Sequence, residues 1–519
     1  MIVLWGSNAR ETHPIFFHHV LRALKRGAKL YVVDPRVTST ARFAHRHLPV
    51  RVGGDIALAN SIAQSVLSEG LENRAFIARA TEDFDAFAKL VSHYTPERAE
   101  AMSGVDPSLV RELARDFATA DRAMICWTLG ITEHHHAVEN VWSLINLALL
   151  CGQVGRYGAG LNPLRGQNNV QGGGDMGALP HKLPGFQDVE DPDARGKYER
   201  SWGATIPPNK GWTLTEMFRA MERKELTALW VIGENPAQSE ADAHHVRGLL
   251  AGLDHLVVQD LFLTRTAEMA TVVLPACAGF AESEGTVTNS ERRVQRVRRA
   301  LPPPGDAKDD LWIVAQMAKR LGRDFGEPTA EALWDEMREH SPLHRGMSYA
   351  RLEAMGGIQW PCPDDQHEGS PFLHERLWEE PVRGPKAPFH PCEHKEPAEA
   401  LDDEFPLRLT TGRRLSEFNT GVQSKGLASP LVKDEALEVS PQDLAALSLL
   451  EGQRVRVRSR RGAVEVPVRV DRGLPKGLVF LSFHQPESVD TNLLTIEATD
   501  PRAGTAEFKA AAVRIERCE

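Results

Sequence analysis

The chain has 519 residues, with 61 lysines and arginines against 71 aspartates and glutamates, so its formal net charge is −10. This acidic balance argues against a general nucleic-acid binder, because phosphate binding favours the opposite sign. Apolar residues make up 42% of the chain, which excludes a wholly disordered protein. Six cysteines without a C-x-x-C spacing exclude a disulfide framework and argue against a cysteine-ligated zinc or iron–sulfur site within the chain. The length predicts about three or four domains.

The N-terminal segment alternates between apolar strands and helices. Residues 2–5 predict a buried parallel strand, and residues 13–26 predict a helix with one apolar face. A second strand ends at Asp34-Pro35, and a third ends in a tight turn before a helix over 56–67. This order of strand, turn, helix, strand and acid is the plan of a nucleotide-binding α/β unit, although the G-x-G-x-x-G fingerprint is absent.

The start of the chain shows no signal peptide, since a basic segment, an apolar segment and a cleavage site are all missing. No apolar run reaches the roughly 18 residues of a membrane-spanning helix. We therefore expect a cytoplasmic protein. A chain that opens inside an apolar strand is unusual, because termini are normally polar and loose.

The composition changes after the expected strand at 123–130. Residues 152–185 are rich in glycine, asparagine and proline, and we expect a long functional loop without packed elements. Strand–loop units are expected over 228–236 and 255–267, and a further strand over 271–276. Helices are expected around 309–321 and 330–340, and mostly β-structure from Phe405 onward. The expected domains are 1–165 (αβα), 166–300 (a second αβα domain with an active-site loop at 160–184), 301–400 (connecting) and 401–519 (β-barrel).

Four loops follow expected strands, where open α/β sheets bind their ligands. They are Gly6-Ser7-Asn8, Asp34-Pro35-Arg36, Gly233-Glu234-Asn235-Pro236 and Gln259-Asp260. Glycine allows a backbone to approach a phosphate closely, and an acid can accept hydrogen bonds from ribose or guanine. Each loop alone is also consistent with an ordinary turn, but together they suggest a large nucleotide-like ligand.

Arg165 lies in the glycine-rich segment and offers a planar fork of donors suited to a small carboxylate. A solvated arginine on a polar surface loop is the alternative. The triplet His134-His135-His136 suggests a metal site, but consecutive residues of a helix point in different directions, which favours a solvated helix start. We expect His244-His245 at the surface and Cys277 as a buried structural thiol. The basic run over 292–299 suits phosphate contacts or a docking face.

The segment NPLRGQNNVQGGGDMGALP resembles the active-site segment of molybdopterin-dependent formate dehydrogenases, catalytic (alpha) subunits of the dimethyl-sulfoxide-reductase superfamily. The resemblance runs along the whole chain and includes GSNARETHP, VVDPR, GENP, VVQDLFLTRTAEMATVVLP, EGTVTNSERRVQ, IQWPC, TTGRRL and GTAEFKAAAVRIE. It implies an α/β fold of two Rossmann-like αβα domains, one of them incomplete, followed by a double-psi-type β-barrel.

The resemblance also implies an activity and a cofactor. Formate would be oxidised to carbon dioxide at a molybdenum or tungsten centre held by two molybdopterin guanine dinucleotides. The electrons would pass through an iron–sulfur cluster to a partner subunit linked to NAD, ferredoxin or hydrogenase. Arg165 would hold the formate carboxylate, and Gln167 would line the site. The implied cofactor-binding residues are Gly6, Ser7, Asn8, Asp34, Arg36, Gly53, Asp55, Gly233, Glu234, Asn235, Gln259, Asp260, Arg413, Asn492, Phe508 and Lys509.

The chain departs from the family pattern in two places. Glu417 stands where the family commonly has a histidine, so one cofactor contact is not carried over. Family members also begin with a cysteine-bearing iron–sulfur domain and then a cysteine or selenocysteine that ligates the metal. All of this lies upstream of the strand at Met1, and none of the six cysteines stands at an equivalent position. No protein ligand to the metal is therefore implied, and we expect an exposed sheet edge where strands are missing.

These departures leave several hypotheses open. The chain is the large part of a catalytic subunit, completed by an upstream polypeptide or cut off by a selenocysteine codon taken as a stop, and is incompetent by itself. Alternatively, it is a non-catalytic molybdopterin-binding or assembly protein. A sister molybdopterin oxidoreductase such as a nitrate reductase is disfavoured by the RGQNNVQG loop.

Overall fold

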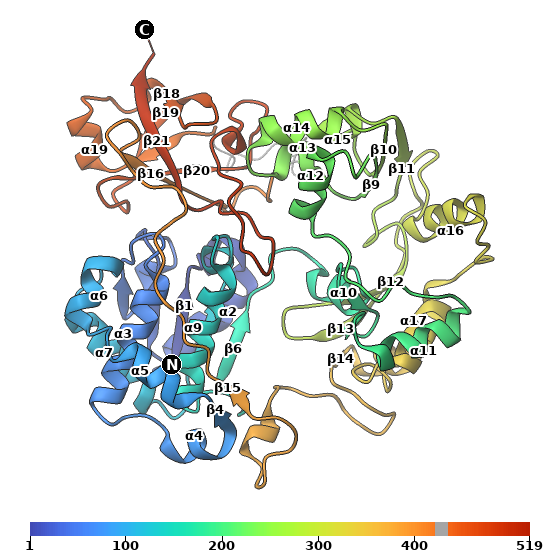
Figure 1. Ribbon diagram of the computed structural model, residues 1–519, viewed down its shortest axis with the longest axis horizontal. Helices are drawn as coiled ribbons and strands as arrows, with labels where there is room; N and C mark the ends of the chain where they lie inside the picture. Colours follow the sequence, from blue (N-terminus) through green and yellow to red (C-terminus); the bar gives the residue numbers. More distant parts are fainter. Residues whose placement is uncertain (421–433, 519) are drawn as a thin grey trace. The chain divides into compact units, whose positions relative to one another are not determined.

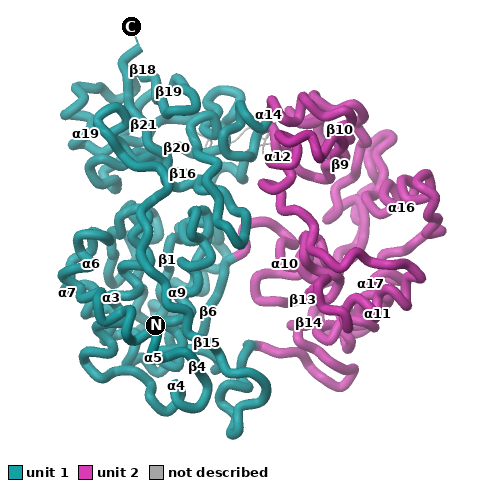
Figure 2. The backbone as a smooth tube through the Cα atoms, in the orientation of Figure 1, with its two compact units in different colours: residues 1–164, 238–246, 372–519 teal, residues 165–237, 247–371 magenta. Residues whose placement is uncertain are grey.

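The computed structural model describes residues 1–420 and 434–518. The chain divides into two compact units, each built from separate segments (Figure 2). Unit 1 comprises Met1–Leu164, Gln238–Val246 and Phe372–Glu519. Unit 2 comprises Arg165–Ala237 and Arg247–Pro371. The region 301–400, expected to connect two domains, is thus shared between both units.

Unit 1 begins with a five-stranded parallel sheet in the order β3-β2-β1-β5-β6. Figure 1 labels β1 and β6 of this sheet. Its strands are β1 (Ile2–Trp5), β2 (Leu30–Val33), β3 (Arg46–Leu48), β5 (Met124–Trp127) and β6 (Gly160–Pro163). Alternate side chains of β1 enter different cores: Val3 and Trp5 pack in one, Leu4 in the other. This period of two buries both faces of the sheet and confirms the expected doubly covered α/β domain.

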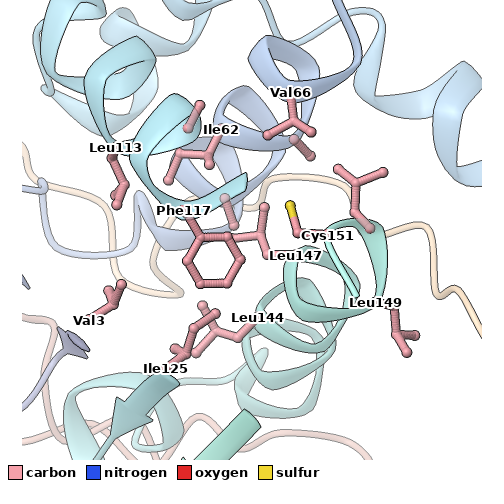
Figure 3. Packing of buried hydrophobic residues seen from close by; sticks show 14 of the residues in the cluster. Val3, Ile62, Val66, Leu113, Phe117, Ile125, Leu144, Leu147, Leu149 and Cys151 are labelled. Atoms are coloured by element: carbon pink, nitrogen blue, oxygen red, sulfur yellow. The ribbon is translucent and has the colours of Figure 1, made fainter. Parts of the chain in front are cut away.

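Helices cover this sheet and fill the larger core. Figure 3 shows Val3 of β1 and Ile125 of β5 with Phe117 of α7 and Leu144 of α9 in that core. The helices of this part are α1 (Ala9–Thr12), α2 (Pro14–Lys25), α3 (Asp55–Ser68), α4 (Arg74–Ala80), α5 (Phe84–Val91), α6 (Pro96–Ser103), α7 (Pro107–Thr119), α8 (Leu129–Thr132) and α9 (Ala137–Leu150), with a 3-10 turn η1 (Ala41–Phe43). The expected helices over 13–26 and 56–67 are confirmed as α2 and α3.

Unit 2 contains a three-stranded parallel sheet in the order β11-β10-β9 and an antiparallel sheet in the order β12-β13-β14. The strands are β9 (Ala228–Ile232), β10 (His255–Asp260), β11 (Val272–Pro275), β12 (Gly285–Thr288), β13 (Arg293–Val297) and β14 (Ile358–Gln359), with a hairpin β7 (Lys182–Leu183) and β8 (Gln187–Asp188). Its helices are α10 (Val170–Asp175), α11 (Pro192–Trp202), α12 (Leu214–Glu222), α15 (Arg265–Glu268), α16 (Asp310–Arg320), α17 (Ala330–His340) and α18 (Tyr349–Met355). Two further helices, α13 (Pro236–Ser239) and α14 (Ala243–Ala251), cross the division between the units.

The expectation that 152–185 lacks packed elements is wrong. Residues 160–163 form β6, which pairs with β5, and residues 170–175 form α10. Pairing of β6 uses main-chain groups, so a strand forms without β-branched side chains. The helix has three glycines, but Gln171 Nε2 donates to Asp175 Oδ1 at 2.9 Å one turn later. Strand pairing at β6 and a hydrogen bond between residues four apart in α10 therefore override the low local propensity.

The C-terminal part of unit 1 is a closed barrel in the order β16-β20-β17-β19-β18-β21. Its strands are β16 (Leu407–Gly412), β17 (Leu437–Val439), β18 (Arg454–Arg458), β19 (Ala463–Val470), β20 (Leu478–Ser482) and β21 (Ala511–Arg517). In β18 the valines point into the barrel and the arginines point outward. Helix α19 (Pro441–Ala446) starts at Ser440, whose Oγ accepts from the Asp443 N–H at 3.0 Å. These findings confirm the expected barrel and its helix.

Short elements complete unit 1. They are β4 (Thr81–Glu82), η2 (Glu375–Trp378), β15 (Ala387–Pro388) and η4 (Thr491–Leu493). β15 pairs with β4, which ties the segment after residue 371 to the N-terminal helices. Within the described parts of the chain, no helix is long and apolar enough to cross a membrane.

Candidate functional site

The turn after β1 is held tightly against the start of α8. Gly6 has a φ of +56°, and a Cβ at this position would stand 2.8 Å from the Gly130 carbonyl carbon. Any side chain there would meet backbone, so only glycine fits. Ser7 follows and is buried, and its Oγ has no hydrogen-bond partner among the residues described. A buried hydroxyl without a partner is a group that a bound ligand can satisfy.

Asn8 and Arg36 organise the same edge of the sheet. Asn8 Oδ1 accepts a hydrogen bond from Thr40 Oγ1 at 2.8 Å, so this side chain links the turns after β1 and β2. The Arg36 backbone N–H donates to Asp34 Oδ1 at 2.9 Å. The Arg36 guanidinium lies 3.7 Å from the centre of the Phe480 ring in β20. Arg36 therefore joins the strand-end turn to the barrel.

Two buried carboxyl groups follow β2 and β3. Burial raises the pKa of Asp34 above its ordinary value, despite the nearby charge of Arg36. Burial likewise raises the pKa of Asp55, although Trp5 Nε1 donates to its Oδ1 at 2.8 Å. Gly53 precedes this site with a φ of +87°. Both acids would gain from further donors, such as the hydroxyls of a ribose or the N–H groups of a guanine.

The His134-His135-His136 segment is a turn between α8 and α9, and the expected solvated helix start is wrong. His134 and His136 are buried, and the Nδ1 atoms of His134 and His135 lie 3.3 and 3.0 Å from Glu507 Oε1. Burial and then the charges of its two neighbours lower the pKa of His136 to about 3. Burial acts to raise the pKa of Glu507, but the hydrogen bonds with His134 and His135 outweigh it and hold that pKa well below its usual range.

The sequence singled out the three histidines but not their partner Glu507, because the two segments are far apart in the chain. The histidines precede α9, whereas Glu507 precedes the last barrel strand. No local pattern links two such segments. The one available signal was the polar character of both, since each is followed by an apolar element that must be buried.

Lys509 lies beside the cluster. Its Nζ is 2.6 Å from Glu133 Oε2 and donates to the Thr411 carbonyl at 3.1 Å. The adjacent Phe508 carbonyl accepts from Thr411 Oγ1 at 2.9 Å. The charge of Lys509 also acts on Asp34, which places the barrel lysine and the strand-end acid in one electrostatic neighbourhood.

Of the remaining residues implied by the resemblance, Arg413 follows β16 and Asn492 lies in η4. The Arg413 guanidinium lies 4.3 Å from the Phe418 ring centre, and its Nε donates to the Glu417 carbonyl at 3.3 Å. Burial lowers the pKa of Arg413 and raises that of Glu417. Asn492 Nδ2 donates at 3.0 Å to the carbonyls of Gln238 and Ser239. Asn492 thus holds the segment 238–246 within unit 1.

In unit 2 the turns after β9 and β10 carry the other predicted residues. Gly233 has a φ of +64°, and Glu234 beside it is exposed. Asn235 Oδ1 accepts from Thr266 Oγ1 at 2.8 Å, which joins this turn to α15.

Gln259 and Asp260 end β10. Gln259 Nε2 donates to Asp310 Oδ1 at 2.5 Å, whereas its buried Oε1 has no partner within the described ranges. Burial raises the pKa of Asp260, although its Oδ1 accepts from the Leu261 N–H at 2.6 Å. This edge of the sheet therefore repeats the unsatisfied polar chemistry found after β1 and β2.

Arg165 is the first residue of unit 2, and its side chain is exposed. A guanidinium nitrogen donates to Gln171 Oε1 at 3.2 Å, and Gln171 Nε2 donates to Asp175 Oδ1 at 2.9 Å. Asp175 is fully buried, and its Oδ2 accepts from Trp360 Nε1 at 2.9 Å. A buried acid thus holds a glutamine, which in turn holds the exposed arginine. Gln167, on the same loop, is exposed as well.

The other candidates have structural surroundings. In the basic run, Arg292 donates to the Trp360 carbonyl, and the Arg296 guanidinium lies 3.3 Å from the Tyr349 ring centre. Cys277 is buried, and burial raises its pKa, which confirms a structural thiol. His244 is exposed and His245 is partly exposed, as expected.

Two parallel sheets whose strands end in glycine turns and acids, together with a closed barrel, define a protein that binds a nucleotide-containing cofactor. The chain belongs to the molybdopterin oxidoreductase family, whose model matches residues 1–320. A second model, the molybdopterin dinucleotide binding domain, matches residues 407–512 and so covers the barrel.

Similar proteins agree with this assignment. The chain is 40% identical to the F420-dependent formate dehydrogenase subunit alpha of Methanocaldococcus jannaschii, over 99% of this chain and 76% of that protein. It is 35% identical to formate dehydrogenase H of Escherichia coli, over 99% of this chain and 72% of that protein. The fold is similar to that of the acetylene hydratase from Pelobacter acetylenicus, with a TM-score of 0.76 at 19% identity, covering 100% of this chain and 78% of that structure.

The residues present fit a molybdopterin dinucleotide. The buried Ser7 hydroxyl and the buried Gln259 carbonyl oxygen each lack a partner in the described part of the chain. Burial raises the pKa values of Asp34 and Asp55, so donors of a bound ligand would stabilise their charged forms. A guanosine offers hydroxyl and N–H donors as well as acceptors, which matches these groups.

Proposed function

We propose that this chain oxidises formate to carbon dioxide with two molybdopterin guanine dinucleotides as its cofactor. The reaction releases one proton and two electrons: HCOO⁻ gives CO₂, H⁺ and 2e⁻. The names of the similar formate dehydrogenases support this substrate. The observation that carries the proposal is the exposed Arg165 held through Gln171 by the buried Asp175.

Arg165 is proposed to bind the formate carboxylate. Two parallel N–H groups of a guanidinium match the two oxygens of a carboxylate, and this bidentate pair fixes orientation as well as position. Gln171 accepts from one edge of the guanidinium and so limits its rotation. Trp360 Nε1 donates to the buried Asp175, which in turn accepts from Gln171. Because Gln171 is held in this way, the fork is oriented before formate arrives. Gln167 is proposed to line the same site.

The cofactor is proposed to lie against two sets of strand-end loops. The guanosine and pyrophosphate parts would contact the loops of both sheets, at Gly6, Ser7, Asn8, Asp34, Arg36, Gly53, Asp55, Gly233, Glu234, Asn235, Gln259 and Asp260. The pterin parts would contact the barrel residues Arg413, Asn492, Phe508 and Lys509. When bound, its molybdenum or tungsten centre supplies the two-electron chemistry. The chain's own residues bind and orient formate, and a partner subunit is proposed to receive the electrons.

The test is Arg165→Lys in the enzyme purified from its native cells with its associated subunits. Lysine keeps the charge but loses the bidentate fork, so kcat/KM for formate should fall by more than about tenfold. Formate-dependent reduction of a viologen dye measures turnover, and metal and pterin contents report cofactor loading. Arg200→Lys, an exposed arginine of α11, is the matched control and should keep normal activity.

Normal turnover in Arg165→Lys with full cofactor content would remove Arg165 from the proposed role. A wild-type protein that carries molybdopterin but never oxidises formate would instead favour a cofactor-binding or assembly function.

A further inference from the structure

Three metal-ligating side chains meet inside unit 1, and one of them, Glu507, directly precedes Phe508 and Lys509, which are proposed to contact the cofactor. His135, His136 and Glu507 each direct one ligand atom to a common region, with all three atoms within 4.8 Å of one another. His135 Nδ1 lies 3.0 Å from Glu507 Oε1 and 3.3 Å from His136 Nδ1. The ligands of a tetrahedral zinc ion stand about 3.3 Å apart, because zinc–nitrogen distances are about 2.0–2.1 Å. The observed separations match this geometry.

The hydrogen bonds of the three groups converge on few atoms: Glu507 Oε1 alone lies 3.3 Å from His134 Nδ1 and 3.0 Å from His135 Nδ1. A ring nitrogen carries at most one hydrogen, yet His135 Nδ1 faces both a carboxylate oxygen and the Nδ1 atom of His136. The other ring nitrogen of His136, Nε2, is buried without a hydrogen-bond partner among the described residues. Lone pairs of two imidazoles and a carboxylate in one place call for a cation between them.

The surrounding contacts hold the groups in position. Glu507 Oε2 accepts from the Ala398 N–H at 2.9 Å, which leaves Oε1 directed at the histidines. His134, whose Nε2 lies 3.1 Å from the Gly130 carbonyl, packs its Nδ1 3.3 Å from the same Glu507 Oε1. In metal sites, a ligating carboxylate is usually fixed by a hydrogen-bond donor that does not itself bind the metal, and the Ala398 N–H takes this place here. His135 is partly exposed, with 21% of its side chain accessible, and provides the route by which an ion enters.

Two other groups of possible ligands differ in a decisive way. In the group His45, Glu112 and Asp116, the acids already pair with cations: Glu112 with Arg46 at 2.9 Å and Asp116 with Lys29 at 2.6 Å. In the group Asp242, His245 and Glu497, the glutamate side chain is 60% exposed, so water satisfies it. In the buried group, Glu507 is instead paired with the imidazoles of His134 and His135, and imidazoles are themselves metal ligands.

We propose that the imidazoles of His135 and His136 and the carboxylate of Glu507 bind one divalent transition-metal ion of the zinc class. This ion is distinct from the metal of the molybdopterin cofactor. It links the turn before α9 to the segment before β21, and it therefore fixes the neighbouring Glu133–Lys509 ion pair.

The experiment measures zinc on the full chain, produced without a polyhistidine tag and dialysed against a weak chelator. We expect about one zinc per chain, separate from molybdenum, by elemental analysis. Cobalt(II) substitution should give the visible absorption of a tetrahedral site with nitrogen and oxygen ligands. Zinc should also raise the melting temperature, because an ion that binds only the folded state stabilises it.

The variants His136→Gln and Glu507→Gln should each weaken zinc binding by more than about tenfold. The matched control is His245→Gln, which removes a histidine of the exposed group and should leave zinc content unchanged. Cobalt spectra of the wild type keep the proposal testable if either variant fails to fold. The proposal is overturned if the wild type holds no zinc or cobalt, or if His245→Gln, and not His136→Gln, loses the metal. If the wild type holds no metal, protons on the histidine rings alone balance the charge of Glu507.

Discussion

The two parallel sheets share a plan but differ in their surroundings. In unit 1, β1 and β2 are almost entirely buried between two layers of helices. In unit 2, apolar side chains of the sheet are accessible: Val272 of β11 is 46% exposed and Ile232 of β9 is 44% exposed. Both sheets nevertheless end in a glycine turn and an acid with a raised pKa. Ligand chemistry at a strand end therefore does not require that the strand itself be covered.

The largest expected difference between the sheets concerns core packing. Leu30 in β2 is fully buried, whereas Val273 in β11 is 40% exposed. Leu30→Ala should lower the stability of unit 1 by about 2–5 kcal/mol, because it leaves a cavity. Val273→Ala should change the stability of unit 2 by about 0.5 kcal/mol or less. Hydrogen–deuterium exchange of peptides from β2, and from β10, which pairs with β11, measures both changes in stability. Equal losses of protection would contradict the expected difference between the two sheets.

The glycine turns should differ by a smaller amount. Alanine at Gly6 would combine an unfavourable φ with a Cβ that meets the backbone of Gly130, and should cost about 3 kcal/mol. Gly233 has a similar φ but open space around it, so Gly233→Ala should cost only about 1–2 kcal/mol. Thermal unfolding followed by limited proteolysis reports each unit. A Gly233 variant as damaged as the Gly6 variant would show that φ strain alone decides both.

The smallest expected effect is on pH dependence. Burial raises the pKa of Asp34 in the folded state, so its contribution to stability is present at acid pH and is lost as pH rises through that folded pKa. Asp34→Asn should therefore make the cofactor-free protein more stable at neutral pH than the wild type, and this gain should vanish in acid. Asp260→Asn should show the same sign with a smaller gain, because backbone N–H groups already bind Asp260. Melting curves from pH 4 to pH 8 test this, and a wild type more stable than Asp34→Asn at neutral pH would contradict it.

The sequence predicted those elements that are determined by their own side chains. Strand β2 is a continuous apolar run, and α19 begins at Pro441 directly after its N-cap Ser440. Both elements could therefore be predicted from their local sequence. The sequence did not predict β6 and α10, whose residues have low strand and helix propensity. Pairing with β5 stabilises β6, and the Gln171–Asp175 hydrogen bond stabilises α10. The strand-end loops were predictable for the same local reason. The contact between the histidines and Glu507 was not predictable, because Glu507 comes close to them only once the barrel has folded.

The discontinuity of unit 1 has a consequence for biosynthesis. Its first 164 residues leave the ribosome early, but β15, the partner of β4, lies beyond residue 371, and so does Gly473, whose carbonyl accepts from the Val37 N–H. At about 5–20 residues per second, the intervening segment from Arg165 to Pro371 takes roughly 10–40 s to translate. During that interval the strand-end turns of the first sheet face water or a chaperone instead of the barrel. The barrel contacts of this edge therefore form only after translation has passed Gly473.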